Sequence, residues 1–259
     1  MVLASQTGWW TMTNADELKR IFREGWTNAS VVAHRVERFL DGEFGFEPSR
    51  RAWREVLTQA AAQGAIGRTL DMGTGPGTVA QLWAELGYET TGVDFSATML
   101  AAGRDAAERR GLAIRFVEAD VEKPPFPKAS FDLVSSRAVL FTLPHPGYAV
   151  ARWVELLRPG GLLVLIGENN PTDPEKLKRQ HRPAANWKPD EQYLAAFAQL
   201  PFPNHTDGMV RVVMEAAGLT QIRTIPMQAV IEARRVHEAL APPYGVLQGT
   251  PYILVGRRA

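Results

Sequence analysis

The amino-acid sequence predicts an α/β fold with a mostly parallel sheet and helices on both of its faces. Between residues 67 and 168, short apolar runs alternate with longer segments that place apolar residues three and four positions apart. This alternation is typical of strand–helix–strand units, which build parallel sheets. The helical segments also close on glycine, a residue type that commonly ends helices.

The predicted elements follow one another in chain order. Strands are predicted over residues 68–73, 88–94, 112–119, 131–136 and 161–167, and two more over 222–231 and 250–258. Helices are predicted over residues 78–87, 96–111, 148–161 and 208–219. The stretch from Glu168 to Asp207 is too long for an ordinary connection, and stretches of that length usually carry function or fold into helices of their own.

The first part of the chain has a different pattern. Residues 14–63 repeat apolar side chains at helical spacing, with a break at the phrase DGEFGFEPS. The sequence therefore predicts a helical N-terminal cap over residues 1–66. A core is predicted over residues 67–259, and an inserted lid over residues 168–206 interrupts it.

Net charge and composition limit the kinds of molecule that the protein is expected to bind. The chain has 259 residues, of which 45% are hydrophobic and 22% charged, and 29 basic and 28 acidic side chains leave a formal net charge of +1. A chain so close to neutral gives no broad electrostatic reason to bind nucleic acid or an anionic membrane. A small-molecule substrate is therefore expected, and the oligomeric state stays open.

Several site types and locations are excluded by what the sequence lacks. The chain contains no cysteine, which excludes disulfides, thiolate metal sites and cysteine nucleophiles. No histidine and carboxylate share ligand spacing on one helix, so no metal is predicted. The amino end turns polar too early for a secretory signal, and no apolar run approaches the roughly 18 residues of a membrane span. A cytoplasmic protein is the expectation.

The most informative phrase is TLDMGTGPGTVAQLWAELG, over residues 69–87. An apolar strand delivers Asp71, a turn with Gly73, Gly75 and Gly77 follows, and a helix begins directly afterwards. Glycines allow a ligand to approach the backbone and tolerate positive φ. The start of the helix then offers free N–H groups to an anionic part of that ligand.

Two classes of nucleotide-cofactor protein use such a turn. The dinucleotide fingerprint G-x-G-x-x-G requires glycine at position 78, where this chain has Thr78. Asp94 ends the second predicted strand about twenty residues later, where both classes place a carboxylate on a ribose diol. The distinguishing feature is Asp120, just past the third predicted strand and followed by a proline-rich turn.

Five phrases in this order resemble the class I S-adenosylmethionine-dependent methyltransferases, and specifically their small-molecule branch. They are LDMGTGPG, GVDFSATML, EADVEKPPFP, FDLVSSRAVLFTLPHP and LRPGGLLVLIGE, and they span about residues 68–168. The resemblance implies a Rossmann-like sheet of seven strands, of which the last is antiparallel. It also implies S-adenosyl-L-methionine as the cofactor and methyl transfer to a small organic acceptor as the activity.

The resemblance further implies which residues hold the cofactor. The glycine turn would wrap the methionine part of the cofactor. Asp94 would hold the ribose hydroxyls, and Asp120 would bind the adenine amino group. Trp26 would lie over the methionine end of the cofactor. The end of the fourth strand would lie beside the sulfonium. The complete predicted set is Asp71, Gly73, Thr74, Gly75, Gly77, Asp94, Phe95, Ser96, Met99, Asp120, Val121, Ser136, Arg137 and Trp26.

The catalytic residue is harder to predict, because methyl transfer from a sulfonium depends mainly on alignment. His145, in the phrase LPHPG, is the predicted base for an acceptor that needs one. Ala138 stands where the family commonly carries a histidine. Aromatic side chains in the cap and the insertion favour an aromatic or apolar acceptor; they are Trp9, Trp10, Trp26, Phe44, Phe46, Trp187, Tyr193, Phe197 and Phe202.

Other functions remain open on the sequence alone. O- or N-methylation in specialised metabolism is the prediction, and C-methylation is an alternative, since an electron-rich carbon also needs mainly positioning. A nicotinamide-dependent oxidoreductase is a second alternative. The third is a non-catalytic module that binds the cofactor or a partner.

Overall fold

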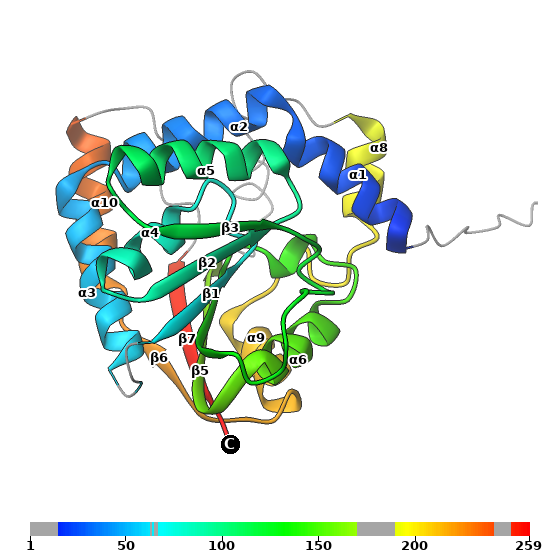
Figure 1. Cartoon of the computed structure of the whole chain (residues 1–259). Coiled ribbons are helices and arrows are strands. Elements are labelled where there is room, and N and C mark those ends of the chain that lie inside the picture. Colours follow the sequence, from blue (N-terminus) through cyan, green and yellow to red (C-terminus); the bar gives the residue numbers. More distant parts are fainter. Residues whose placement is uncertain (1–14, 63, 65–66, 170–189, 241–249) are drawn as a thin grey trace, which may run out of the picture.

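A computed structural model describes residues 15–62, 64, 67–169, 190–240 and 250–259 of the chain (Figure 1). It contains one sheet, helices on both faces of that sheet, and further helices above one end of it. Three predicted aromatic residues of the cap and insertion, Trp9, Trp10 and Trp187, lie outside the described residues.

Seven strands form the sheet, in the spatial order β3-β2-β1-β4-β5-β7-β6. They are β1 (Arg68–Met72), β2 (Glu89–Asp94), β3 (Ile114–Glu118), β4 (Phe131–Arg137), β5 (Leu157–Asn169), β6 (Leu219–Ile225) and β7 (Thr250–Arg258). β7 is antiparallel to both of its neighbours, β5 and β6, whereas the other pairings are parallel. The predicted sheet, with its antiparallel last strand, is confirmed.

Two layers of helices cover the sheet (Figure 1). The helices α3 (Glu47–Ala61), α4 (Thr78–Glu85) and α10 (Gln228–Leu240) share one buried apolar cluster with the sheet. The helices α6 (Pro146–Leu156) and α9 (Asp207–Ala216) share a second cluster with it. The helix α5 (Ala97–Arg109) lies along β3.

Three fully buried tryptophans anchor these layers, and each has a partner for its indole N–H. Trp53 donates to Glu43 Oε1 at 2.8 Å, Trp83 donates to Ser135 Oγ at 3.0 Å, and Trp153 donates to the Val121 carbonyl at 2.8 Å. A buried indole needs such a partner, because an unpaired N–H in the core would cost stability. Each tryptophan therefore also fixes a residue near the carboxyl ends of the strands.

The predicted strand over residues 222–231 is wrong in its second half. β6 ends at Ile225, and α10 begins at Gln228. Pro226 has no N–H to donate to a strand ladder, so the strand stops before it. Val230 and Ala233 then pack into the first apolar cluster at helical spacing. A short apolar run does not by itself distinguish a buried strand from the first turns of a helix.

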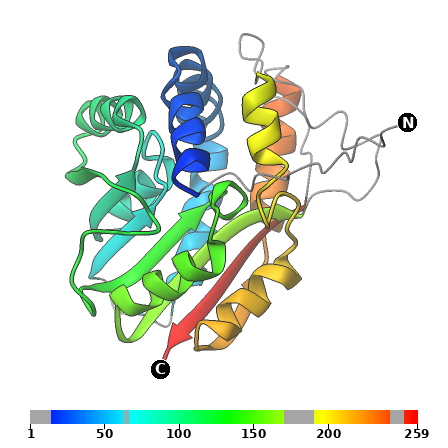
Figure 2. The same cartoon turned by 90° about the vertical axis from the view of Figure 1, so that its right-hand side faces the viewer.

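Short helices lie above the carboxyl ends of the central strands. They are α1 (Ala15–Thr27), α2 (Ala29–Arg35), the π-helix η1 (Val36–Glu43) and α8 (Glu191–Phe197). Figure 2 shows α1 and α8 side by side above the sheet. Their contact is a small apolar cluster in which Leu18, Ile21 and Phe22 of α1 meet Ala196 and Leu200.

The described ranges contain no helix that is long and apolar enough to cross a membrane. Within the same ranges, no three potential ligands gather where they could hold a metal ion. The division of the chain into a cap, a core and a lid stays a prediction.

Candidate functional site

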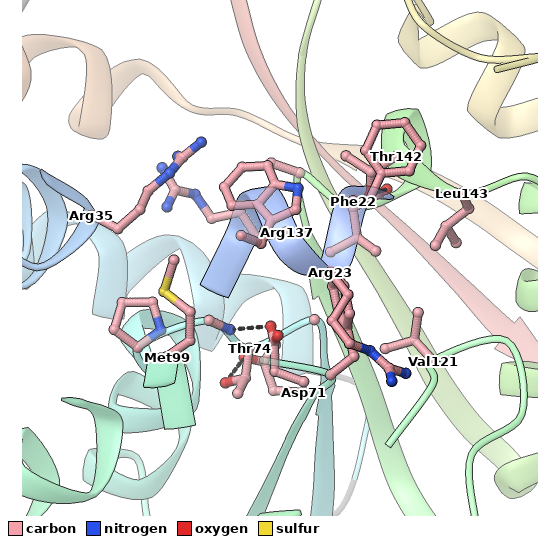
Figure 3. Close-up of a pocket in the computed structure, with 18 of the residues that line it drawn as sticks. Phe22, Arg23, Arg35, Asp71, Thr74, Met99, Val121, Arg137, Thr142 and Leu143 are labelled. Atoms are coloured by element: carbon pink, nitrogen blue, oxygen red, sulfur yellow. Dashed lines mark hydrogen bonds between the residues drawn. The ribbon is translucent and has the colours of Figure 1, made fainter. Parts of the chain in front are cut away.

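A pocket lies at the ends of β1, β2 and β4, with side chains of α1 on its far side (Figure 3). It encloses about 1160 Å³ of space between atoms, part of which opens to solvent. The sheet order reverses between β1 and β4, and ligands of open α/β sheets bind at such a reversal.

The glycine turn forms one wall of this pocket. Asp71, at the end of β1, accepts hydrogen bonds from Thr74 Oγ1 and Ser135 Oγ, both at 2.7 Å. Burial raises the pKa of Asp71 to about 6, although both hydroxyls oppose the shift. Gly73 and Gly75 have φ values of 66° and 54°, a region that favours glycine.

The two glycines differ in what surrounds them. A Cβ atom on Gly73 would lie 2.2 Å from Val139 Cγ2, so the fold itself requires glycine there. A Cβ on Gly75 would meet nothing within 4 Å. Gly75 therefore leaves its backbone accessible to a ligand in the pocket.

Asp94, at the end of β2, connects the turn to the next helix. Its Oδ2 accepts the Gly75 N–H at 2.8 Å, and its Oδ1 accepts the Ser96 N–H at 2.9 Å. Burial raises the pKa of Asp94 to about 6, while these backbone N–H groups lower it. Each carboxylate oxygen still has room for another donor. Ser96 in turn caps α5 by accepting the Met99 N–H at 3.3 Å.

Asp120, two residues past β3, pairs with the cap. Lys19 Nζ of α1 lies 2.7 Å from Asp120 Oδ2 and 2.5 Å from Glu122 Oε2. Glu122 is buried, accepts the His145 N–H at 2.7 Å, and lies 3.2 Å from His145 Nδ1. The His145 side chain is 56% exposed and stands at the N-terminal end of α6.

A buried group of charges backs the pocket on the β4 side. The guanidinium of Arg137 lies 4.7 Å from the centre of the Phe39 ring and 3.6 Å from Glu43 Oε2. Glu43 Oε1 also accepts from Arg234 Nε at 2.6 Å. Burial raises the pKa of Glu43, but Arg234 and Arg137 outweigh it and hold that pKa below its ordinary value. Glu43 is thus an ionised carboxylate between two arginines.

Most of the predicted site residues meet in the pocket. Its lining includes Trp26, Asp71, Gly73, Thr74, Gly75, Asp94, Phe95, Met99, Asp120, Val121 and Arg137. Among the described residues, Gly77, Ser96, Ser136 and His145 lie outside that lining. Gly77 is the N-cap residue that precedes α4, and Ser136 Oγ donates to the Met72 carbonyl at 2.9 Å between two strands.

Other lining residues were not predicted. Lys19, Phe22, Arg35 and Phe39 come from the cap helices, and Phe141 follows β4. No spacing in the sequence distinguishes them from side chains that pack or face solvent on a helix. The phrase REGWTNAS, which contains Trp26, was the one signal that pointed to this part of the cap.

Sequence comparison finds enzymes with named methyl-transfer activities. A family model described as "Methyltransferase domain" matches residues 70–165. A demethylmenaquinone methyltransferase of Thermus thermophilus is 38% identical over 44% of this chain and 53% of its own length. A malonyl-[acyl-carrier protein] O-methyltransferase of Enterobacter lignolyticus is 37% identical over 45% of each chain. The chain spans about half the length of the curated relatives it matches.

Structural comparison extends the likeness to most of the chain. A phosphoethanolamine N-methyltransferase 2 of Haemonchus contortus, in complex with S-adenosyl-L-methionine, covers 92% of this chain and 60% of its own, at 17% identity and a TM-score of 0.64. A [4+2]-cyclase, SpnF, covers 81% of this chain and 80% of its own, at 19% identity and a TM-score of 0.55. At these identities the likeness is one of fold. The matching family model, together with the sheet order, identifies residues 70–165 as a methyltransferase domain with the class I S-adenosylmethionine-dependent fold.

Proposed function

We propose that this protein transfers the methyl group of S-adenosyl-L-methionine to a small organic acceptor. The observation that carries the proposal is that Asp71, Gly75, Asp94 and Asp120 line one pocket, along the ends of three neighbouring strands. These residues offer hydrogen-bond acceptors and an open backbone to a nucleoside. The fold alone would not support the proposal, because one neighbour of similar fold is described as a cyclase.

In this proposal each acidic residue has its own part of the cofactor to bind. Asp94 accepts hydrogen bonds from the ribose hydroxyls with the lone pairs that Gly75 and Ser96 leave free. Asp120 accepts from the adenine amino group, and Met99 and Val121, both buried, contact the ring. The open backbone at Gly75 approaches the methionine part.

The bound cofactor supplies an activated methyl group whose leaving group is a neutral thioether. The chain's own contribution is to align the acceptor with that methyl and to exclude water, since reacting atoms need to approach to about 3 to 3.5 Å. Phe22 and Trp26 of α1 line the cap side of the pocket, and their apolar cluster with α8 would limit the access of water from that side.

We further propose O- or N-methylation of the acceptor in specialised metabolism, in the cytoplasm, with C-methylation as the alternative. The relatives act on different atoms by their names, one as an O-methyltransferase and others as C-methyltransferases. Because His145 is mostly exposed and lies outside the pocket lining, its described position favours an acceptor that needs no base from this residue.

Replacing Gly75 with alanine is expected to weaken cofactor binding at least tenfold. A Cβ there meets no protein atom and would intrude on the ligand instead. Gly87 offers a matched control, because it also has a positive φ, of 89°, and open space around its Cα, but it lies outside the pocket lining. Both variants should lose about 1 kcal/mol of stability from backbone strain. Equal cofactor affinities of the two variants, measured by calorimetry, would contradict the placement of Gly75.

The proposed function is tested by binding and then by turnover. Calorimetry should show binding of S-adenosyl-L-methionine and of its demethylated product, and none of NAD. Radiolabelled methyl groups should then pass from the cofactor to components of a small-metabolite extract. Binding of NAD alone would favour the oxidoreductase alternative. Cofactor binding without transfer to any component would favour a non-catalytic module or a different reaction.

A further inference from the structure

Three arginines of the cap and β4 gather around one phenylalanine at the pocket. The ring centre of Phe39 lies 5.2 Å from the guanidinium carbon of Arg35, 5.4 Å from that of Arg38 and 4.7 Å from that of Arg137. Phe39, Arg35 and Arg137 all line the pocket. This arginine group, Arg35, Arg38 and Arg137, therefore brings two positive charges to the pocket lining and a third, that of Arg38, to the Phe39 ring beside it.

Among the described residues, the arginine group has fewer carboxylate partners than positive charges. Arg137 shares Glu43 with Arg234, and Arg234 also pairs with Glu168 Oε1 at 2.9 Å. Within the described part of the chain, no carboxylate lies within 4 Å of the guanidinium nitrogens of Arg35 or Arg38. Guanidinium groups this close repel one another in the absence of an anion.

Arg35 is the member of this group best placed to meet a ligand. It is partly buried, and its guanidinium lies 4.7 Å from the centre of the Trp26 ring. Trp26 also lines the pocket. Burial, and after it the charges of Arg38 and Arg137, lower the pKa of Arg35 to about 10, so it stays charged at neutral pH. Stacking on two rings holds its plane and leaves its edge N–H groups to donate.

The arginine group lies across the pocket from the acidic residues that are proposed to bind the cofactor. Figure 3 shows Arg35 and Arg137 on one side of the pocket, and Asp71 and Thr74 on the other. The acidic residues bind the cofactor in the proposed function, so the positive side is left for the second ligand. A guanidinium binds a carboxylate through two parallel hydrogen bonds, which fixes orientation as well as position.

We propose that the acceptor is an organic acid, whose carboxylate Arg35 binds and whose apolar skeleton packs against the aromatic side chains that line the same side of the pocket. The proposal rests on the proposed function and names its substrate class. It explains why aromatic rings line the same side of the pocket as Arg35, a cation that has no carboxylate partner among the described residues. It also gives the alignment step a fixed point, because a two-point contact at Arg35 restrains the acceptor relative to the cofactor's methyl group.

The test compares acids with their uncharged amides while the cofactor product S-adenosylhomocysteine saturates the protein. The probe pairs are benzoate and benzamide, indole-3-acetate and indole-3-acetamide, and decanoate and decanamide, measured by calorimetry at pH 7.5. We expect at least one acid to bind ten times more tightly than its amide. Arg35→Gln should remove this preference, and Arg35→Lys, which keeps the charge without the paired donors, should keep part of it.

Two controls keep the result specific to Arg35. Arg51→Gln removes an exposed arginine of α3 and should leave the acid preference unchanged. The ratio of acid to amide affinity is measured in each variant, so a variant with partly lost fold is still informative, and melting curves show whether it is folded. S-adenosylhomocysteine affinity is measured separately and should change less than threefold in Arg35→Gln.

Three results would overturn the proposal. The first is that no acid of the series binds better than its amide. The second is an acid preference that survives Arg35→Gln. The third is a large loss of S-adenosylhomocysteine affinity in Arg35→Gln, which would assign Arg35 to the cofactor's own carboxylate. Failure of the proposed function has a different signature, namely that the unaltered protein does not bind the cofactor or its product at all.

Discussion

Asp94→Ala is expected to weaken the binding of S-adenosyl-L-methionine between ten- and a hundredfold at pH 7.5. In the proposed function the Asp94 carboxylate accepts hydrogen bonds from the ribose hydroxyls, and a charge-assisted hydrogen bond contributes about 1.5 to 3 kcal/mol. The substitution also leaves the Gly75 and Ser96 N–H groups without their acceptor, which loosens the turn against α5. Calorimetry with the cofactor measures the effect.

Asp132→Ala is the matched control for Asp94→Ala. Asp132 also accepts a backbone N–H, that of Arg68 at 2.7 Å, and it also stands on a strand of the sheet. It is the second residue of β4, at the end of that strand away from the pocket, and it pairs with Arg158. Its loss should lower the melting temperature without changing cofactor affinity. If both variants bind the cofactor as tightly as the unaltered protein, Asp94 has no role in binding.

The pKa values of Asp94 and Asp71, both raised to about 6 by burial, predict a pH dependence of cofactor binding. Since both pKa values lie at about 6 instead of 3.8, acidification from pH 8 to pH 5.5 should protonate the carboxylates and weaken cofactor binding. The effect of the same groups on folding has the opposite sign. A carboxyl group whose pKa is raised in the folded state contributes most stability below about pH 4, and this contribution is lost as the pH rises through about 6. Weaker binding at pH 5.5 would therefore not report unfolding caused by these groups.

The acidic residues of the site could be predicted because they follow strands. Asp71, Asp94 and Asp120 each come at or just after the end of a recognisable apolar run, and parallel strands bring those ends to one edge. Side-chain alternation was harder to judge, and Ser136 points between strands instead of into the pocket. The predicted base, His145, also comes after a strand, β4. The chain between β4 and His145 directs the imidazole to Glu122 and to solvent.

The cap residues could not be predicted, because tertiary packing alone selects them. Arg35, Phe39 and Glu43 lie on α2 and on η1, a π-helix in which the Phe44 N–H donates to the Phe39 carbonyl at 2.7 Å. A π-helical turn shifts which side chains face inward relative to the 3.6-residue repeat. The apolar periodicity of the sequence predicts an ordinary helix there, and so it does not identify Phe39 as a pocket residue or Glu43 as a buried one.

Glu43→Gln is expected to lower the free energy of unfolding by about 3 kcal/mol, because removal of one partner leaves buried charges uncompensated. Glu43 is 8% exposed, and it compensates Arg137 and Arg234 together while accepting the Trp53 N–H. Glutamine keeps the size of the side chain and one acceptor, so the loss reports the charge. Urea denaturation at pH 7.5 measures it. Glu47→Gln, which breaks the exposed pair with Arg54 at 3.1 Å, is the control and should cause no measurable loss.

A double-mutant cycle separates charge compensation from simple packing at Glu43. Arg234→Met removes one of the two cations that Glu43 compensates and keeps an apolar stem of similar reach. If uncompensated charge causes the loss, the double variant should be destabilised by clearly less than the sum of the single variants, because the second substitution removes a charge that the first left unpaired. Additive losses would instead mean that Glu43 and Arg234 stabilise the protein independently. The arginines of the pocket would then owe their positions to the surrounding rings and not to Glu43.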